Sequence, residues 1–225
     1  MEELLEIKRL FDLSKTVAAP LFNKKSYPWE ILAEIPDFVL LLGESLPKDR
    51  FIRVEQGIWI ARGAKVAPSA KICAPCIIDE DAEVRHCAYI RGAAVVGKGA
   101  VVGNSCELKN CILFDGAQVP HFNYVGDSVL GYRSHLGAGA ITSNVKSDKT
   151  LAEVRCGDRK IATARKKVGA FLGDGVEVGC GSVLNPGTVI GRGARIYPLS
   201  SVRGYVPEGS IYKSYGEIVA IEKSY

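Results

Sequence analysis

Two basic residues, Arg91 and Lys109, stand eighteen residues apart in this chain. If the backbone repeats with a period that divides eighteen, the two residues lie on one surface with their backbones about 4.8 Å apart, the spacing of adjacent strands. Two cations this close repel each other unless an anion joins them. A phosphate suits both, since Arg offers a planar fork and Lys a compact charge. The pair therefore predicts a site for a small anionic ligand.

A titratable base and two polar groups follow the same spacing. His121, Tyr124 and Asn144 fall on the face that continues from Arg91 and Lys109, or on the turn that enters it. Neutral imidazole, with an unperturbed pKa near 6.5, accepts a proton at pH 7. The five residues together predict a site that holds an anion and moves a proton.

The element that positions them is a repeat of six residues. Aliphatic side chains recur at this period, which is neither the 3-and-4 spacing of a helix nor the alternation of a single strand. Ala or Cys stands two residues before most of them and fits a crowded corner. A six-residue repeat is typical of a parallel β-helix, with three hexads in each eighteen-residue coil. The first run is Ile60, Val66, Ile72, Ile78, Val84, Ile90, Val96, Val102 and Leu108.

The repeat then shortens by one residue at two places, between Leu108 and Leu113 and between Val125 and Leu130, and it resumes at Leu172 after an interruption rich in Lys and Arg. Because each coil buries its faces only on its neighbours, a stack of coils needs caps. We therefore expect a helical N-terminal cap over residues 1–50, a β-helix over 51–205 with a projecting loop at 143–167, and a C-terminal cap over 206–225.

Composition excludes several function classes. The net charge of +4 is too small to indicate nucleic-acid or membrane-surface binding. The longest run of large apolar residues, 38–42, is too short to span a bilayer. Seven cysteines without a signal-peptide pattern predict reduced thiols in a cytoplasmic protein.

Three stretches carry a family resemblance: NSCELK at 104–109, HFNYVGD at 121–127 and LGAGAITSN at 136–144. In these stretches, and in its one-residue slip, the chain resembles the acetyltransferase domain of the bifunctional N-acetylglucosamine-1-phosphate uridyltransferase/glucosamine-1-phosphate acetyltransferase. That domain is a left-handed β-helix of the hexapeptide-repeat acyltransferase superfamily. The resemblance implies a coenzyme-A-dependent N-acyltransferase. It would use acetyl-coenzyme A and a phosphorylated or nucleotide-linked amino sugar, would need no metal, and would form a homotrimer with coenzyme A between adjacent β-helices.

The resemblance also implies residue roles. His121 matches the catalytic base, Arg91 and Lys109 match the residues that hold the sugar phosphate, and Tyr124 and Asn144 match substrate contacts. His135 stands among the substrate contacts where the family has Asn, and Val145 stands where it has Tyr. The remaining matches are a loop lysine at Lys149, a backbone contact near the thioester oxygen at Ala138, and acetyl-coenzyme A contacts at Cys180 and Pro198.

Two other functions stay open on the sequence. A zinc site like that of the γ-class carbonic anhydrases is one, with His86, His121 and His135 as the available imidazoles, although the closely spaced His pair of that class is missing. A non-catalytic β-helix, like the tail domains of sugar-nucleotide pyrophosphorylases, is the other, since a fold does not fix a function.

Overall fold

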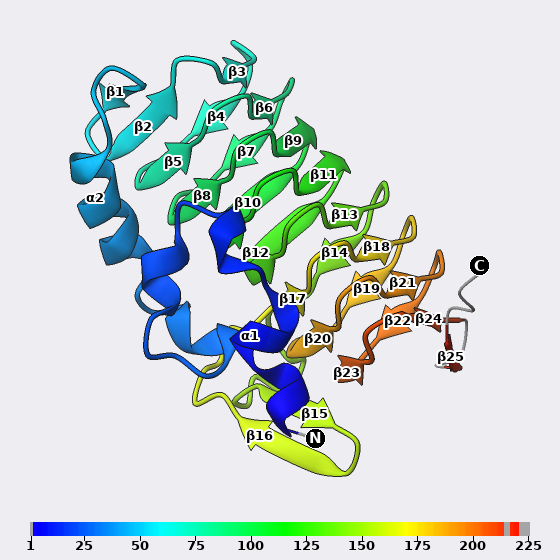
Figure 1. Ribbon diagram of the computed structural model, residues 1–225. Helices are drawn as coiled ribbons and strands as arrows, with labels where there is room; N and C mark the ends of the chain where they lie inside the picture. The colour runs from blue at the N-terminus through cyan, green and yellow to red at the C-terminus, as the bar shows by residue number, and fades with distance from the viewer. Residues whose placement is uncertain (1, 214–216, 221–225) are drawn as a thin grey trace, which may run out of the picture.

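The computed structural model describes residues 2–213 and 217–220 and shows a left-handed parallel β-helix (Figure 1). The aliphatic residue of each hexad points into one continuous core, and Ile90, Leu108 and Val125 are fully buried. The predicted fold class is therefore confirmed. Each coil contributes one strand to each of three faces.

The first face consists of β2 (Ile58–Ala61), β5 (Cys76–Ile78), β8 (Ala94–Val96), the later part of β10 (Glu107–Leu113), the later part of β12 (Tyr124–Leu130), β17 (Ala170–Leu172), β20 (Thr188–Ile190) and β23 (Tyr205–Val206). The second face consists of β3 (Lys65–Val66), β6 (Glu83–Val84), β9 (Val101–Asn104), β11 (Gln118–His121), β13 (His135–Leu136), β18 (Glu177–Val178), β21 (Arg195–Ile196) and β24 (Ser210–Tyr212). The third face consists of β4 (Lys71–Ile72), β7 (Tyr89–Ile90), the first parts of β10 and β12, β14 (Ile141–Thr142), β19 (Val183–Leu184) and β22 (Ser201–Val202).

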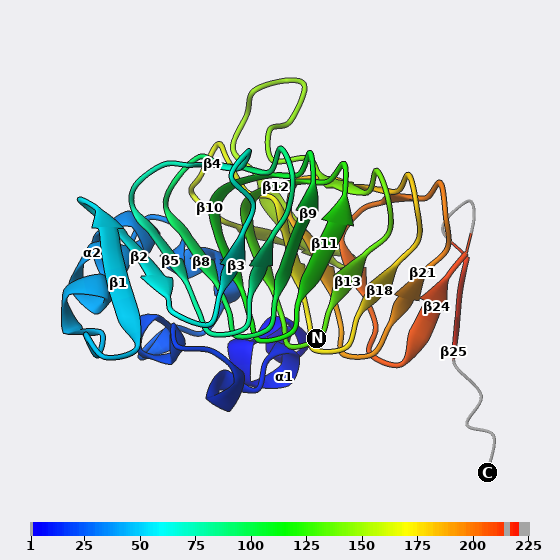
Figure 2. The same cartoon turned by 90° about the horizontal axis from the view of Figure 1, so that it is seen from above.

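The N-terminal segment runs along the outside of the first face (Figure 2). It contains α1 (Ile7–Leu10), α2 (Ile35–Ser45) and four short 3₁₀ helices at Glu2–Leu5, Leu13–Lys15, Ala19–Phe22 and Pro28–Ile31. Its Phe22, Trp29 and Val39 pack on the outward side chains of the strands beneath. First-face strands such as Ala94–Val96 and Ala170–Leu172 are accordingly buried on both sides and apolar throughout.

The one-residue slip tightens one corner of the coil. Leu108 lies beside Val125 in parallel register, and β10 and β12 each continue around the corner from the third face to the first. Asn110 and Asp127 turn that corner with positive φ angles of 50° and 48°. Asn and Asp tolerate this conformation better than most residues. The slip therefore places two polar side chains one above the other at an edge of the third face.

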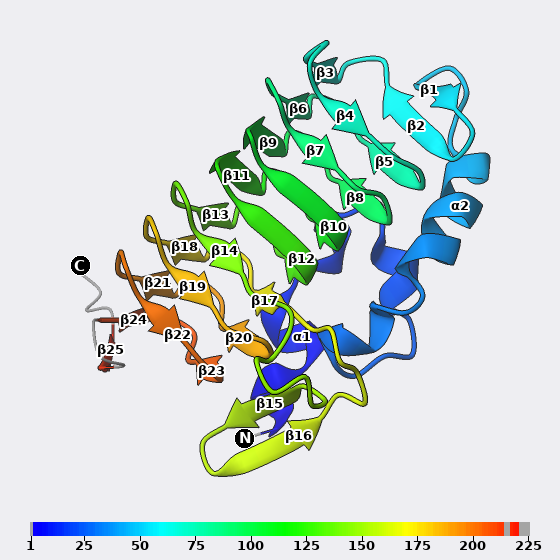
Figure 3. The same ribbon diagram turned by 180° about the vertical axis from the view of Figure 1, so that it is seen from behind.

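A hairpin leaves the coil between β14 and β17. Its strands β15 (Glu153–Cys156) and β16 (Arg159–Ala162) pair antiparallel and project beyond the coils near α1 (Figure 3). The first coil is covered by β1 (Phe51–Glu55) on β2, and β25 (Ile218–Ala220) pairs with β24 at the other end. The end of the predicted C-terminal cap lies outside the described residues, and the domain boundaries stay predictions. None of the helices described is long and apolar enough to cross a membrane.

Candidate active site

A buried carboxylate organises the edge where the third face meets the first. We call this edge corner B and define it by residues 92–93, 110, 127 and 168–169. Asp127, only 2% exposed, accepts hydrogen bonds from the side-chain amides of Asn110 (2.8 Å) and Asn144 (2.5 Å). The Lys109 ammonium lies 3.3 Å from the same carboxylate. Burying a carboxylate is costly unless it is paired and hydrogen-bonded, and these contacts satisfy it.

Arg91 lies one coil away from Lys109, as the eighteen-residue spacing predicts. The Arg91 amide donates to the Leu108 carbonyl at 2.8 Å, so the two basic residues stand side by side on the third face. The Arg91 guanidinium pairs with Glu107 at 2.7 Å, and this partner raises its pKa. Each stacked cation thus has a carboxylate of its own, which relieves their repulsion.

Tyr124 joins this cluster from the middle of the third face. Its hydroxyl accepts a hydrogen bond from Asn144 at 3.2 Å, and burial raises its pKa. Tyr124 is therefore a neutral phenol at pH 7 and can itself donate a hydrogen bond to a ligand. Lys109, Tyr124 and Asn144 meet around one carboxylate, and Arg91 borders them.

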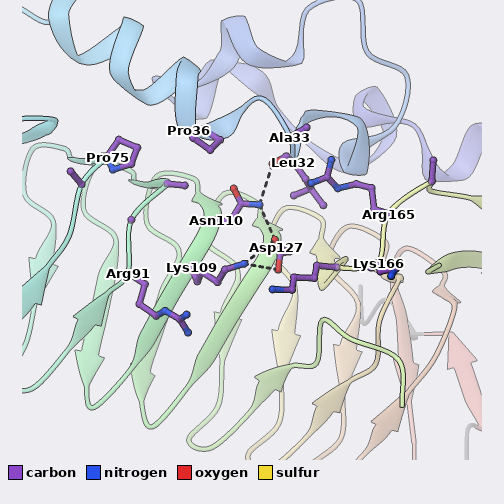
Figure 4. Close-up of a pocket in the computed structure, with 15 residues that line it drawn as sticks. Leu32, Ala33, Pro36, Pro75, Arg91, Lys109, Asn110, Asp127, Arg165 and Lys166 are labelled. Carbon is purple, nitrogen blue, oxygen red and sulfur yellow. Dashed lines mark hydrogen bonds and ion pairs between the residues drawn. The ribbon is translucent and has the colours of Figure 1, made fainter. Parts of the chain in front are cut away.

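A pocket of about 680 Å³ opens at corner B (Figure 4). Arg91, Lys109 and Asp127 line it from the β-helix, and Lys109 and Lys166 both extend toward the middle of the pocket. Its basic lining residues are Arg91, Lys109, Arg165, Lys166 and Lys167, and its apolar wall is formed by Leu32, Ala33, Pro36, Ala74 and Pro75.

Two polar atoms of the lining residues have no hydrogen-bond partner. The amide of Asn110 donates to both the Leu32 carbonyl (3.1 Å) and Asp127, which leaves its oxygen without a donor. The Nε of Arg165 is also buried and unpaired. An unsatisfied buried group costs on the order of 1–3 kcal/mol, so these two atoms are a local cost in the lining of the pocket.

His121 lies on the opposite edge of the third face. We call this edge corner A and define it by residues 86, 104–105, 121–122, 138, 180 and 198–199. His121 ends β11 and is exposed, and among the described residues its imidazole has no hydrogen-bond partner. Its backbone is fixed, because its amide donates to Asn123 (3.0 Å) and its carbonyl accepts from Gly139 (3.0 Å). His121 does not line the corner-B pocket, so the third face separates the base from the two cations.

The predicted cofactor contacts form one column beneath His121. The amide of Gly181 donates to Ala138 at 2.8 Å, and that of Leu199 donates to Cys180 at 2.9 Å. Ala138, Cys180 and Pro198 are all exposed. Successive coils lie about 4.8 Å apart, so the column follows the helix axis away from the imidazole. This geometry suits an extended ligand that ends at His121.

Two predicted residues lie apart from the cluster. His135 is on the second face, where its ring pairs with Glu177 at 2.8 Å, and it stacks on Gln118 rather than near Lys109. Lys149 is exposed in the turn before the hairpin and lines neither corner. The predicted roles of both remain untested.

Sequence reasoning missed three groups of this site. Asp127 ends the HFNYVGD stretch, and Asn110 directly follows Lys109. Both lie in the hexads that are one residue short, so the one-residue slip was the sequence signal that could have identified them. Arg165 and Lys166 belong to the basic run ARKK at 164–167. This run follows the hairpin and lies at corner B, where it lines the pocket.

The described residues contain no group of three or more His, Cys, Asp or Glu that could hold a metal ion. His86, the nearest imidazole along corner A, is hydrogen-bonded to Ser69 at 2.6 Å and to the Cys87 thiol at 3.2 Å. Its two ring nitrogens therefore both have partners within the chain.

Comparison with known proteins places the chain among hexapeptide-repeat proteins. The family described as "GMPPB C-terminal domain" matches residues 72–190. A bifunctional sugar-1-phosphate nucleotidylyltransferase/acetyltransferase from Sulfurisphaera tokodaii is 37% identical over 109 residues, which are 48% of this chain and 27% of the relative. The bifunctional protein GlmU of Methanococcus maripaludis strain C5 is 31% identical over 53% of this chain and 29% of its own. These names confirm the resemblance drawn from the three sequence stretches, and the chain spans less than a third of either relative.

Solved structures with lower identity were also found. The acetyltransferase domain of PglB from Neisseria gonorrhoeae is 18% identical, with a TM-score of 0.33 over 69% of this chain and 54% of that one. An acetyltransferase structure from Desulfovibrio desulfuricans is 19% identical, with a TM-score of 0.39 over 70% and 28%.

Proposed function

Because the chain belongs to the GMPPB C-terminal domain family, whose match covers residues 72–190, we propose that it transfers an acetyl group from acetyl-coenzyme A to the amine of a phosphorylated amino sugar. The observation that carries the proposal is the arrangement of the third face. A solvated imidazole lies at one edge, cations lie at the other, and Tyr124 lies between them. An acceptor laid across this face presents its amine to His121 and its phosphate to Lys109 and Arg91.

The acceptor end relies on charge. Lys109 and Arg91 bind the phosphate, and charge-assisted hydrogen bonds to phosphate are among the stronger polar contacts. The Tyr124 hydroxyl and the Asn144 side chain would contact the sugar hydroxyls. Asp127 holds Asn144, which in turn donates to the Tyr124 hydroxyl. Fixing the sugar at both ends orients the amine, which is where much of the rate gain of a two-substrate reaction originates.

The chemical step needs one base and one oxyanion contact. His121 takes a proton from the amine as its nitrogen bonds to the thioester carbon, and the carbon–sulfur bond then breaks to release the coenzyme A thiolate, which is protonated in turn. The amides of Gly137 and Gly139 are used by backbone carbonyls, whereas no described hydrogen bond uses the amide of Ala138. Of these three amides, Ala138 N–H is therefore the one available to stabilise the oxyanion.

The assay follows free thiol release from acetyl-coenzyme A with a panel of amino-sugar phosphates. Replacing His121 by Ala removes the base, and we expect a loss of about 10²- to 10⁴-fold in kcat with one of these acceptors. His86→Ala is the matched control, because it removes another exposed imidazole of corner A that lies outside the proposed site.

Two outcomes contradict the proposal. If wild-type protein releases no thiol with any acceptor, catalysis of this class is absent and a non-catalytic β-helix describes the chain better. If His121→Ala retains the wild-type kcat while acceptors are used, another group is the base.

A further inference from the structure

The corner-B pocket holds more positive charge than one phosphate needs. Arg91 and Lys109 already face Glu107 and Asp127. Arg165, Lys166 and Lys167 line the same pocket, and within the described part of the chain they form no ion pair. Three cations without carboxylate partners around one opening attract anions. The pocket therefore favours a ligand with a second anionic group.

The position of these cations decides where the second anion lies. Arg91 and Lys109 belong to the third face, whereas the 164–167 segment reaches corner B after the hairpin and approaches from beyond that face (Figure 4). His121 lies at the other edge. The second anionic group therefore lies on the far side of the first phosphate from the amine, as the outer phosphate of a diphosphate would.

The rest of the pocket fits a neutral, partly flat group. Leu32, Pro36 and Pro75 form an apolar wall opposite the cations. This combination of an apolar wall and nearby cations matches a nucleoside attached to a diphosphate, because the wall can pack against the base while the cations hold the diphosphate.

We propose that the corner-B pocket binds the nucleoside diphosphate part of a nucleotide-linked amino sugar, with the diphosphate between Lys109 and the Arg165–Lys166 pair and the nucleoside against the Leu32–Pro36 wall. The amino-sugar end of this assignment rests on the proposed acetyl transfer. Binding of the nucleoside diphosphate itself does not.

The first test is calorimetric titration of the wild-type protein with UDP, GDP, pyrophosphate and inorganic phosphate at low ionic strength. We expect UDP or GDP to bind at least about tenfold more tightly than pyrophosphate, and pyrophosphate more tightly than phosphate. Equal affinity for pyrophosphate and both nucleotides overturns the nucleoside assignment. Absence of binding by all four anions overturns the whole proposal.

The second test changes one pocket cation. Lys166→Ala removes a charge-assisted contact and should weaken binding of the tighter nucleotide by about tenfold or more. Lys160→Ala is the matched control, because Lys160 is an exposed lysine of the adjoining hairpin strand β16 that does not line the pocket. Equal losses in the two variants indicate general charge attraction and overturn the proposal. Lys166→Gln removes the charge but keeps a longer polar side chain than Ala does. A thermal unfolding scan checks that each variant is folded.

Turnover separates this inference from the proposed function. With acetyl-coenzyme A, the ratio of KM for a nucleotide-linked amino sugar to KM for the corresponding sugar 1-phosphate should rise about tenfold in Lys166→Ala. An unchanged ratio, with both acceptors acetylated, overturns the pocket assignment and leaves acetyl transfer standing. Tight nucleotide binding without acetylation of any acceptor supports the pocket and removes the proposed catalysis.

Discussion

At the scale of single residues, Asp127 is the group on which the site depends. It is buried, and it fixes Lys109, Asn110 and Asn144 at once. A carboxylate in this position sets the direction of the Lys109 ammonium and keeps Asn144 beside Tyr124. The phosphate-binding cation is thus held in place before any ligand arrives, which lowers the entropic cost of binding.

Coupling between Lys109 and Asp127 is the measurable consequence. We expect Asp127→Asn to lower the free energy of unfolding by about 1–3 kcal/mol, since an amide N–H would then face donors. In a double-mutant cycle with Lys109→Met, the coupling energy should reach about 1 kcal/mol or more. Urea denaturation of the four proteins measures it.

The control for this cycle is the exposed pair Lys146–Asp148, joined at 3.4 Å. Exposed pairs contribute little, so its coupling energy should lie below that of the buried pair. Coupling of Lys109 to Asp127 no larger than that of the surface pair would show that Asp127 does not hold the ammonium.

At the scale of elements, the N-terminal segment is fastened to the β-helix by Asp174. Its carboxylate accepts from the amides of Asp12 (2.7 Å) and Tyr132 (2.9 Å), and its own amide donates to Leu10 (3.0 Å). The segment in turn supplies Leu32 and Pro36 to the corner-B pocket. A contact far from corner B therefore helps to form one wall of it.

Asp174 also gives a pH dependence whose sign follows from burial. Burial raises the pKa of Asp174, so the folded state holds the proton more tightly than the unfolded chain, in which the pKa is near 3.9. Its contribution to stability is consequently lost as the pH rises from about 4 through the raised value. Asp174→Asn lacks this titration. We expect its destabilisation, measured by urea denaturation, to be larger at pH 4 than at pH 7.

Asp148→Asn provides the opposite case. Hydrogen bonds from Thr150 lower the pKa of Asp148, so its contribution is present above the unfolded pKa and is lost as the pH falls. Its destabilisation should therefore be the larger one at pH 7. The same pH trend in both variants would rule out burial as the cause at Asp174.

At the scale of the whole molecule, corner A carries exposed apolar side chains along the proposed cofactor column. Phe122 is 62% exposed and Leu199 is 85% exposed, and both have positive φ angles of 52° and 57°. Large apolar residues in this conformation are uncommon on a free surface. The homotrimer implied by the family resemblance would cover them with a neighbouring β-helix.

The trimer can be tested by a charge at corner A. Light scattering of the wild-type protein should give the mass of three chains, and Leu199→Asp should shift it toward one chain because burying an unpaired carboxylate is costly. Leu41→Asp is the control, since Leu41 is 75% exposed on α2, away from corner A. A monomeric wild type, or dissociation by both variants alike, contradicts the expected interface.

The period of six determined the β-helix. Each hexad carries its own inward aliphatic residue, and the same position recurs in every coil, so the pattern can be read from the sequence alone. It also placed Arg91 beside Lys109, since their stacking follows from counting residues along a regular coil. The same counting predicted that Tyr124 and Asn144 would share their face. These parts of the site needed nothing beyond the spacing.

Only the tertiary structure decided what surrounds them. The period assigns a side chain to a face of the coil but not to a rotamer or a partner, so it left open that Asp127 binds Lys109 and that His135 pairs with Glu177 on the second face. Nor does a repeat describe segments that break it. The hairpin brings Lys166 to corner B, and the N-terminal segment brings Leu32, by long-range packing that has no periodic signal. The coil fixes the stacked residues, and the non-repeating segments complete the pocket around them.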